Sequence, residues 1–294
     1  MAKITIVGSG IIGLTIASQL SRHHEITVIA RDLPGDEPSI KWASPWAGAN
    51  FVAGGCSSDR ERRMQMEAFT ELWRLAIRHP ESSVKRLPME EFYDNERSDD
   101  DLWFKDFIPG VCKALRKNMT IVLNPHIFMS WLKRNLESSG VKFKRMKLDS
   151  LSDAHHLGHD VLINATGEGP KHLSDIKDQN MELLRGQTMI IKSDYKKSFM
   201  RDDGKTYTYI VTRVNRSLPE HFSADLADYE IVGHNVGIRP YRSSMRIEKE
   251  TKNGQNIVHA YGITGGGFIY SFGVAREVVK LVDEFLFPHG KARI

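Results

Sequence analysis

The 294-residue chain has little of what defines several classes of protein. It contains only two cysteines, Cys56 and Cys112, which excludes a disulfide scaffold and gives no reason to expect an oxidising compartment. No apolar run approaches the roughly 20 residues that a membrane-spanning helix needs. The N-terminus also lacks the charged, apolar and cleavage regions of a signal peptide. We therefore expect an intracellular, enzyme-sized protein with one large domain or two small ones.

A large net charge and a metal-ligand pattern are also missing. The formal net charge of +4 is small and evenly spread, so the composition does not indicate a nucleic-acid partner. The densest basic segment, residues 142–147, alternates with apolar residues and predicts a strand with one solvated face. The neighbouring histidines His155, His156 and His159 have no cysteine or carboxylate set to complete a zinc pattern. We expect no metal, no nucleic acid and no membrane among its partners.

What the sequence does contain begins at the N-terminus. Residues 3–7 are a short apolar, β-branched run that leads directly into GSGIIG at residues 8–13. A helix-compatible stretch and a second apolar strand at residues 26–30 follow, which predicts a β-α-β unit. Glycine suits such a turn because a side chain would block the turn, a pyrophosphate, or the contact of helix with strand. The predicted dinucleotide-binding residues are Gly8, Gly10, Ile12 and Gly13.

The second strand ends at Arg31 and Asp32. An acidic group at this place usually accepts a ribose hydroxyl, and Asp32 fits that role. Arg31 beside it is equally suited to a 2′-phosphate, so this pair does not separate FAD, NAD and NADP. An exposed ion pair without a cofactor role is the alternative.

Two later segments repeat the order of strand and glycine turn. Residues 161–167 (VLINATG) are an apolar strand that ends in small residues, and residues 257–267 (IVHAYGITGGG) lead into a helix. Amphipathic helices are predicted after Ser58 and after Asn124, and alternating strands are predicted around Tyr207 and around residues 245–248.

These elements predict an α/β fold with two interleaved domains. A Rossmann-like nucleotide domain would be built from both chain ends, and a substrate domain with a mixed or antiparallel sheet would interrupt it. We assign residues 1–55, 125–185 and 255–294 to the cofactor domain, and residues 56–124 and 186–254 to the substrate domain.

The motifs together resemble the FAD-dependent D-amino-acid oxidase family, and its fungal members most closely. Beside the glycine turn, the matching blocks run through the whole chain in family order. They are residues 30–34 (ARDLP), 43–50 (ASPWAGAN), 163–167 (INATG), 185–187 (RGQ), 234–242 (HNVGIRPYR) and 261–262 (YG). The block at 43–50 is far more specific than the glycine turn, and it indicates FAD in place of a nicotinamide cofactor.

The resemblance implies a set of FAD contacts. The small residues of the block at 43–50 would let backbone N–H groups approach the flavin and the pyrophosphate. Leu148 aligns with a backbone contact to adenine, and Thr166 lies near the pyrophosphate side. By resemblance, the remaining FAD contacts are Ala43, Ser44, Gly48, Ala49, Asn50, Thr264, Gly267, Phe268 and Ile269.

The resemblance also implies a catalytic site and a reaction. Arg239 matches the arginine that clamps the substrate carboxylate, a task suited to a planar two-pronged donor. Tyr209 aligns with the tyrosine that helps to fix this carboxylate, and Gly265 aligns with a carbonyl facing the substrate amine. The implied reaction is hydride transfer from the α-carbon to the flavin, followed by imine hydrolysis and reoxidation by O2 to give hydrogen peroxide. As bare residues, an arginine paired with a core carboxylate and tyrosines on a plain sheet surface are the alternatives.

The sequence departs from this family in three places. Residues 214–230 are far shorter than the family's usual segment, which predicts the loss of a strand and either an exposed sheet edge or a homodimer. Thr212 stands where the family favours proline, and Ile263 where a histidine or aromatic is common. The alternatives to a D-amino-acid oxidase are therefore a flavoprotein of the same fold that acts on another amine, and a FAD-binding relative with impaired catalysis.

The sequence gives only a weak signal for the cellular compartment. The last three residues, Ala292, Arg293 and Ile294, resemble only loosely the Ser-Lys-Leu address of peroxisomes. We expect a peroxisomal or cytoplasmic location.

Overall fold

A computed structural model of the chain divides into two compact units. Unit 1 comprises Met1–Ala47, Met129–Gly186 and Gly237–Ile294, and unit 2 comprises Gly48–Phe128 and Gln187–Val236. In the part of the chain that is described, no helix is long and apolar enough to cross a membrane. The described residues are 1–56, 58–93, 103–104, 107–108, 117–192, 197–202, 207–210 and 230–288.

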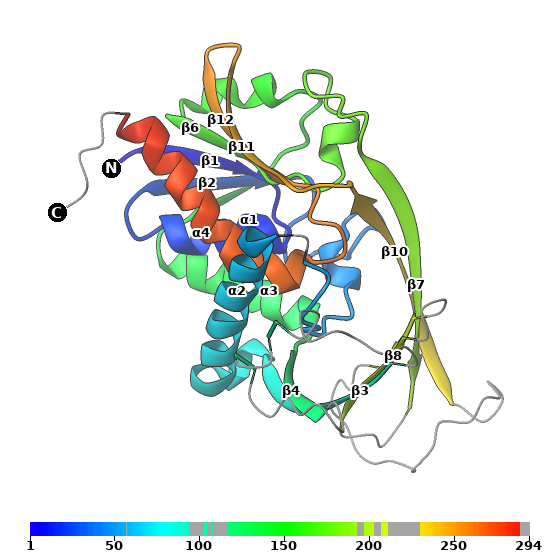
Figure 1. Ribbon diagram of the computed structural model, residues 1–294. Coiled ribbons are helices and arrows are strands. Elements are labelled where there is room, and N and C mark those ends of the chain that lie inside the picture. Colours follow the sequence, from blue (N-terminus) through cyan, green and yellow to red (C-terminus); the bar gives the residue numbers. More distant parts are fainter. Residues whose placement is uncertain are drawn as a thin grey trace. The chain divides into compact units, whose positions relative to one another are not determined.

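Unit 1 contains a six-stranded sheet in the order β11-β12-β6-β1-β2-β5 (Figure 1). The five strands from β12 to β5 are parallel, and β11 pairs antiparallel to β12 at one edge. Strands from both chain ends thus lie side by side. Their bounds are β1 Lys3–Val7, β2 Glu25–Ala30, β5 Lys142–Arg145, β6 Val161–Asn164, β11 Arg246–Lys252 and β12 Gln255–Tyr261.

Two helices of unit 1 pack against each other beside this sheet. They are α1 (Ile11–Leu20) and α4 (Gly267–Leu286), and the Thr15 hydroxyl of α1 donates to the Ser271 carbonyl of α4 at 3.1 Å. Since α1 joins the neighbouring parallel strands β1 and β2, these three elements are the β-α-β unit that the sequence predicts.

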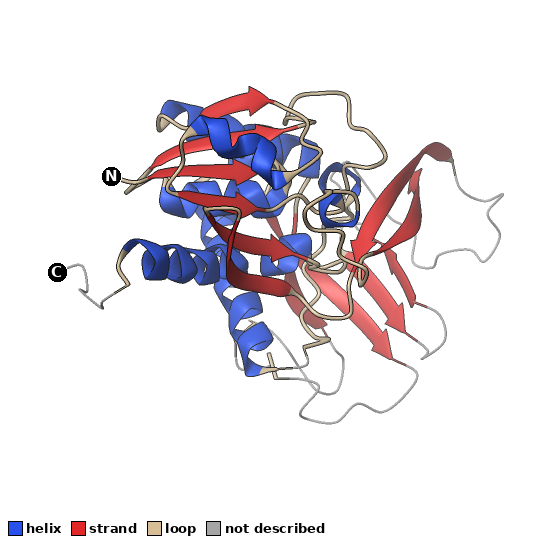
Figure 2. Cartoon of the chain, turned by 90° about the horizontal axis from the view of Figure 1, so that it is seen from above, coloured by secondary structure: helices blue, strands red, loops and turns tan. Residues whose placement is uncertain are grey.

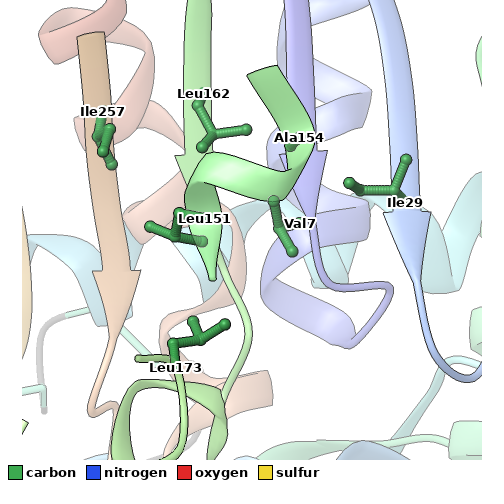
Figure 3. Close-up of a cluster of buried hydrophobic side chains, with 7 residues drawn as sticks. All are labelled: Val7, Ile29, Leu151, Ala154, Leu162, Leu173 and Ile257. Carbon is green, nitrogen blue, oxygen red and sulfur yellow. The ribbon is translucent and has the colours of Figure 1, made fainter. Parts of the chain in front are cut away.

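The other face of the sheet carries an apolar cluster (Figure 3). Alternation along the strands sends every second side chain to this face. A 3-10 helix, η4 (Leu151–Leu157), covers it, and its first turn is held by the capping box of Ser150 and Asp153. The cluster consists of Val7, Ile29, Leu151, Ala154, Leu162, Leu173 and Ile257.

Unit 2 contains a four-stranded sheet in the order β4-β3-β8-β9. It is mixed, because β3 pairs antiparallel to β4 but parallel to β8. The helix α2 (Asp59–Arg78) packs against β3 and β4, and the Ser58 hydroxyl accepts from the Glu61 N–H, as the capping motif predicts. The strands are β3 Lys85–Tyr93, β4 Lys117–Val122, β8 Ser198–Asp202 and β9 Tyr207–Ile210.

Three longer elements continue from one unit into the other. The helix α3 (Pro125–Ser138) begins with the Asn124 side chain accepting from the His126 N–H, as its sequence predicts. The strands β7 (Glu182–Ile191) and β10 (Ile231–Tyr241) pair with each other. The short 3-10 helices are η1 (Ser44–Trp46), η2 (Pro80–Ser82) and η5 (Gly169–Lys171).

The chain contains both helices and strands (Figure 2). The predicted α/β fold, with a Rossmann-like sheet built from both chain ends, is confirmed. The assignment of residue ranges to a cofactor domain and a substrate domain stays a prediction. Cys112, Thr212, the short segment up to residue 229 and the C-terminal tripeptide 292–294 lie outside the described residues.

Candidate cofactor and substrate site

The glycine turn after β1 packs closely against the turn after β6 and against the start of α1. Gly8 has φ +115°, and a Cβ built on it would lie 2.2 Å from the Ala165 carbonyl oxygen in the turn after β6. A Cβ on Gly13, in the first turn of α1, would lie 1.9 Å from the Gly8 carbonyl oxygen. Both contacts are to backbone atoms, which cannot rotate away. The turn therefore requires glycine at both positions, as the sequence predicts.

The N-terminus of α1 has no side-chain cap of its own. Its N-cap residue is Gly10, and the Ile11 N–H donates to the hydroxyl of Ser44 at 3.1 Å. A Cβ on Gly10 would lie 3.0 Å from this same hydroxyl. The ASPWAGAN block thus reaches the glycine turn directly, and the N–H groups at a helix start favour an anion there.

At the end of β2, Arg31 lies between two carboxylates. Its Nε is 2.7 Å from the Asp32 carboxylate, and its Nη1 is 3.5 Å from Glu168 Oε1. The Ser9 hydroxyl donates to the Asp32 carbonyl and so ties the glycine turn to this strand end. Because two carboxylates face one guanidinium, the site favours a ribose hydroxyl over the 2′-phosphate of NADP.

Glu168 is a feature that the sequence analysis missed. It is 8% exposed, and among the described residues its Oε2 atom has no hydrogen-bond partner. The sequence signal that would have indicated it is a carboxylate between two glycines, directly after an apolar strand.

The turns after β6 and β12 are each fixed by a polar side chain. In the first, the Thr166 hydroxyl and N–H both donate to Asn164 Oδ1, at 2.7 and 3.3 Å. In the second, the Thr264 hydroxyl donates to the Arg242 carbonyl at 2.8 Å and accepts from the Arg242 N–H. Both strands end at the same edge of the parallel sheet as β1, where dinucleotides bind in this class of fold.

A charged cluster supports the second turn. The Arg242 guanidinium donates to Asp178 at 3.0 Å, and the Tyr261 hydroxyl donates to the same carboxylate at 2.9 Å. Burial opposes ionisation of Asp178, but hydrogen bonds from Asn180 and Tyr261 and the charge of Arg242 leave its pKa below the ordinary value. Burial raises the pKa of Tyr261 to about 12, so this phenol stays a donor.

The other predicted FAD contacts of unit 1 lie on these same elements. A Cβ on Gly267 would lie 3.3 Å from the Ile11 side chain, so the start of α4 packs against the start of α1. Phe268 is buried and Ile269 half-buried in the first turn of α4. Leu148 packs against the apolar cluster under η4, and Ala43 accepts from the Trp46 N–H at the start of η1.

Arg239 and Gly265, two of the predicted catalytic residues, lie together in unit 1. A Cβ on Gly265 would be 3.4 Å from Arg239 Nη1, and Gly265 has φ +66°. Arg239 is exposed, and within the described ranges its guanidinium has neither an ion pair nor a hydrogen bond. In the described part of the chain no carboxylate pairs with Arg239, so nothing there supports the alternative of an ion pair with a core carboxylate.

The remaining predicted site residues belong to unit 2. The Asn50 amide donates to the Ser198 hydroxyl and accepts from the Thr120 hydroxyl, both at 2.9 Å. The Ala49 carbonyl accepts from the Leu123 N–H at 3.2 Å, and Gly48 begins the unit. The backbone of Tyr209 pairs with Met200 in β8. The roles of these four residues toward FAD and substrate stay predictions.

The features of unit 1 fit one class of ligand. Glycines that no side chain can replace, a helix start whose N-cap residue is Gly10 and a carboxylate at the end of β2 together have the features of a dinucleotide cradle. FAD has the pyrophosphate and ribose that such residues hold. The fold and the site thus define a dinucleotide-dependent enzyme of the Rossmann-like class.

Comparison with known proteins is consistent with this class. The model of the family described as FAD dependent oxidoreductase matches residues 3–219. The chain is 30% identical to a D-amino-acid oxidase of Fusarium vanettenii, over 96% of both chains, and 27% identical to a D-aspartate oxidase of Talaromyces thermophilus, over 95% of both. The chain belongs to the FAD-dependent oxidoreductase family, and its cofactor is FAD.

Solved structures show the same fold. A glycine oxidase of Geobacillus kaustophilus superposes over the whole of both chains with a TM-score of 0.67 at 16% sequence identity. The alignment to the Fusarium vanettenii enzyme spans 354 residues, more than the 294 of this chain, so that relative carries residues that this chain lacks.

Proposed function

We propose that the chain catalyses the oxidative deamination of a D-amino acid, in which the amino acid, O2 and water give a 2-oxo acid, ammonia and hydrogen peroxide. The relatives named D-amino-acid oxidase and D-aspartate oxidase support this reaction class. The observation that carries the proposal is the guanidinium of Arg239, which lies beside the Gly265 turn without a carboxylate partner in the described residues.

The geometry around Arg239 suits the capture of a carboxylate. An arginine whose charge no protein carboxylate balances gains most from an anionic ligand, and its planar fork binds both carboxylate oxygens. Gly265 has no side chain, so a small ligand can approach its backbone next to that fork. In our proposal Arg239 holds the substrate carboxylate and the Gly265 carbonyl accepts from the substrate amine. A contribution of Tyr209 to the same carboxylate rests on the family resemblance alone.

Bound FAD supplies the two-electron chemistry, because the flavin accepts a hydride and is reoxidised by O2. The chain contributes position and charge. With two points of the substrate fixed by Arg239 and Gly265, the α-C–H bond has one orientation, which removes the entropy cost of alignment. The N-cap of α4 is Gly266, without a side-chain cap, so the positive end of this helix is available to a developing negative charge.

For the substrate we propose a neutral D-amino acid. An acidic side chain would need a second unpaired cation, and Arg242 is already bound to Asp178 at 3.0 Å, with both side chains largely buried. Arg213 and Arg216 lie outside the described residues.

A substrate panel tests the function. Purified holoprotein should be yellow, and mixing it anaerobically with D-alanine, D-methionine or D-valine should bleach the flavin absorbance near the visible maximum. L-enantiomers serve as the matched control and should leave the spectrum unchanged. Bleaching by D-aspartate alone would contradict a neutral substrate, and bleaching only by amines without a carboxylate would overturn the proposed reaction in favour of another amine oxidase.

Assembly and location form a smaller part of the proposal. Among the described strands, β9 pairs only with β8, which leaves one edge of the unit 2 sheet for a second copy of the chain. We propose a homodimer, and light scattering of the holoprotein should give twice the chain mass. A monomer at micromolar concentration would contradict it. The proposed location is inside the cell, in peroxisomes or cytoplasm, and fractionation of the native cells would test it.

A further inference from the structure

A row of polar side chains continues the apolar cluster of unit 1 toward the cofactor edge of the sheet. Leu162 and Ile257 belong to the cluster (Figure 3), and the residues two positions further on are Asn164 and His259. Because side chains two apart on a strand point to the same face, the polar pair extends the same surface. The register places His259 directly beside Asn164, and both are 0% exposed.

The hydrogen bonds of His259 fix which ring nitrogen carries the proton. Its Nε2 lies 2.7 Å from the Glu250 carboxylate, which can only accept, so Nε2 is the donor. Burial opposes ionisation of Glu250, but its bonds to His259 and the nearby cations leave its pKa below the ordinary value. The neutral ring then presents Nδ1 as an acceptor. The Asn164 Nδ2 group donates to it at 3.2 Å.

This arrangement decides the orientation of the Asn164 amide. With its nitrogen directed to His259, the amide turns its oxygen to Thr166, where it accepts from the hydroxyl at 2.7 Å and from the N–H. The Ala165–Thr166 peptide packs on the dinucleotide turn, because a Cβ built on Gly8 would lie 2.2 Å from the Ala165 carbonyl oxygen and 3.2 Å from the Thr166 nitrogen. A change at His259 would therefore be transmitted to the wall of the cofactor site.

We propose that His259 is a positioning residue for FAD, which holds the Thr166 turn in its binding geometry through the Asn164 amide. The proposal rests on FAD as the cofactor and is independent of the proposed substrate. A protonated His259 would present an N–H at Nδ1 to the Asn164 amino group, so two donors would meet. Rotation of the Asn164 amide would remove this repulsion, but it would place the amino group against the Thr166 N–H and so loosen the turn.

The charges around His259 determine how it responds to pH. Three charged residues of β11 act on the ring, namely Glu248, Glu250 and Arg246. From β6 it faces the neutral Asn164 amide, and Asp178 contacts Tyr261 on the same face of the sheet. Burial lowers the pKa of His259 below its ordinary value, against the opposing effect of Glu250. The ring thus binds fewer protons in the folded protein, and FAD retention should be constant above the ordinary histidine pKa of 6.5 and fall as the pH drops below it.

The first experiment follows the release of FAD from diluted holoprotein by the rise of flavin fluorescence. The change His259→Leu leaves the buried Asn164 amino group without its acceptor, while Glu250 keeps Arg246 at 3.3 Å. It should weaken FAD binding by roughly fivefold to a hundredfold, the range for an unsatisfied buried polar group. His259→Gln keeps one acceptor and one donor, so it should restore binding. His159→Leu is the matched control, because His159 bonds to Gln255 in the same sheet but not to a cofactor turn.

The second experiment reverses the pH dependence. The wild type should release FAD faster as the pH falls from 7 to 5, and His259→Gln should show a flat profile. Asn164→Asp replaces the amide donor with a carboxylate that accepts from a protonated His259, so this variant should retain FAD better as the pH falls. The same acid-sensitive profile in all three proteins would overturn the role of His259. So would a His259→Leu variant that melts earlier but releases FAD at the wild-type rate.

Discussion

Replacing Arg239 by methionine should lower kcat/KM for a D-amino acid by about a hundredfold to ten-thousandfold. The guanidinium has no partner among the described residues, so the change leaves no protein carboxylate unpaired and should not destabilise the fold. What is lost is a two-pronged, charge-assisted pair of hydrogen bonds, each worth about 1.5–3 kcal/mol. Steady-state assay of hydrogen peroxide with the preferred D-amino acid measures the effect.

Two controls separate this loss from indirect causes. The flavin spectrum and the rate of FAD release should stay close to the wild type in Arg239→Met, because Arg239 lies beside Gly265 and is not one of the predicted FAD contacts. Arg239→Lys keeps the charge but loses the fork, so it should recover only part of the activity. Unchanged turnover in Arg239→Met would remove the clamp from the mechanism, and with it the observation that carries the proposed function.

The parts of the fold that could be predicted are those whose signals are local. The run KITIV and the turn GSGIIG predict β1 and the start of α1, and both lie where expected. Ser58 and Asn124 mark the starts of α2 and α3 through cap bonds within three residues. A local signal needs no knowledge of the rest of the chain, because the strand, the turn and the cap are decided by neighbouring residues.

The polar interior of unit 1 could not be predicted in this way. Asn164 and His259 are 95 residues apart, and Arg31 and Glu168 are 137 apart. Each pair depends on strand order, and the position of β6 between β1 and β12 is settled only by the whole sheet. A histidine inside the apolar strand IVHAY shows by sequence alone only that one polar side chain is buried. Its partner becomes visible once the register places it beside Asn164.

Arg239 and Gly265 are an intermediate case. They lie on β10 and on the turn before α4, and the resemblance to an oxidase family brought them together before the structure did. The structure places them close together, with 3.4 Å between Arg239 Nη1 and a Cβ built on Gly265. The absence of a carboxylate beside Arg239 in the described ranges is different, because no pattern in the sequence indicates which arginines stay unpaired.

The second large effect is expected at Gly13. An added methyl group in Gly13→Ala would lie 1.9 Å from the Gly8 carbonyl oxygen, far inside van der Waals contact. Overpacking that side chains can absorb costs about 1–3 kcal/mol, but here the opposing atom is backbone, so either α1 or the turn after β1 must move. Both hold the predicted pyrophosphate site. We expect FAD affinity to fall by a hundredfold or more, measured by quenching of flavin fluorescence during titration of the apoprotein.

A matched glycine variant shows whether this loss belongs to the site. Gly35 has φ +105° and nothing within 4 Å of a built Cβ, so Gly35→Ala carries the backbone penalty of an alanine at positive φ without a steric clash. It should lower the unfolding temperature slightly and leave FAD affinity close to that of the wild type. Wild-type affinity in Gly13→Ala would show that the start of α1 does not hold the pyrophosphate. Because Gly13 lies in the cradle and far in sequence from Arg239, that result would leave the carboxylate clamp untouched and would relocate only the cofactor's phosphates.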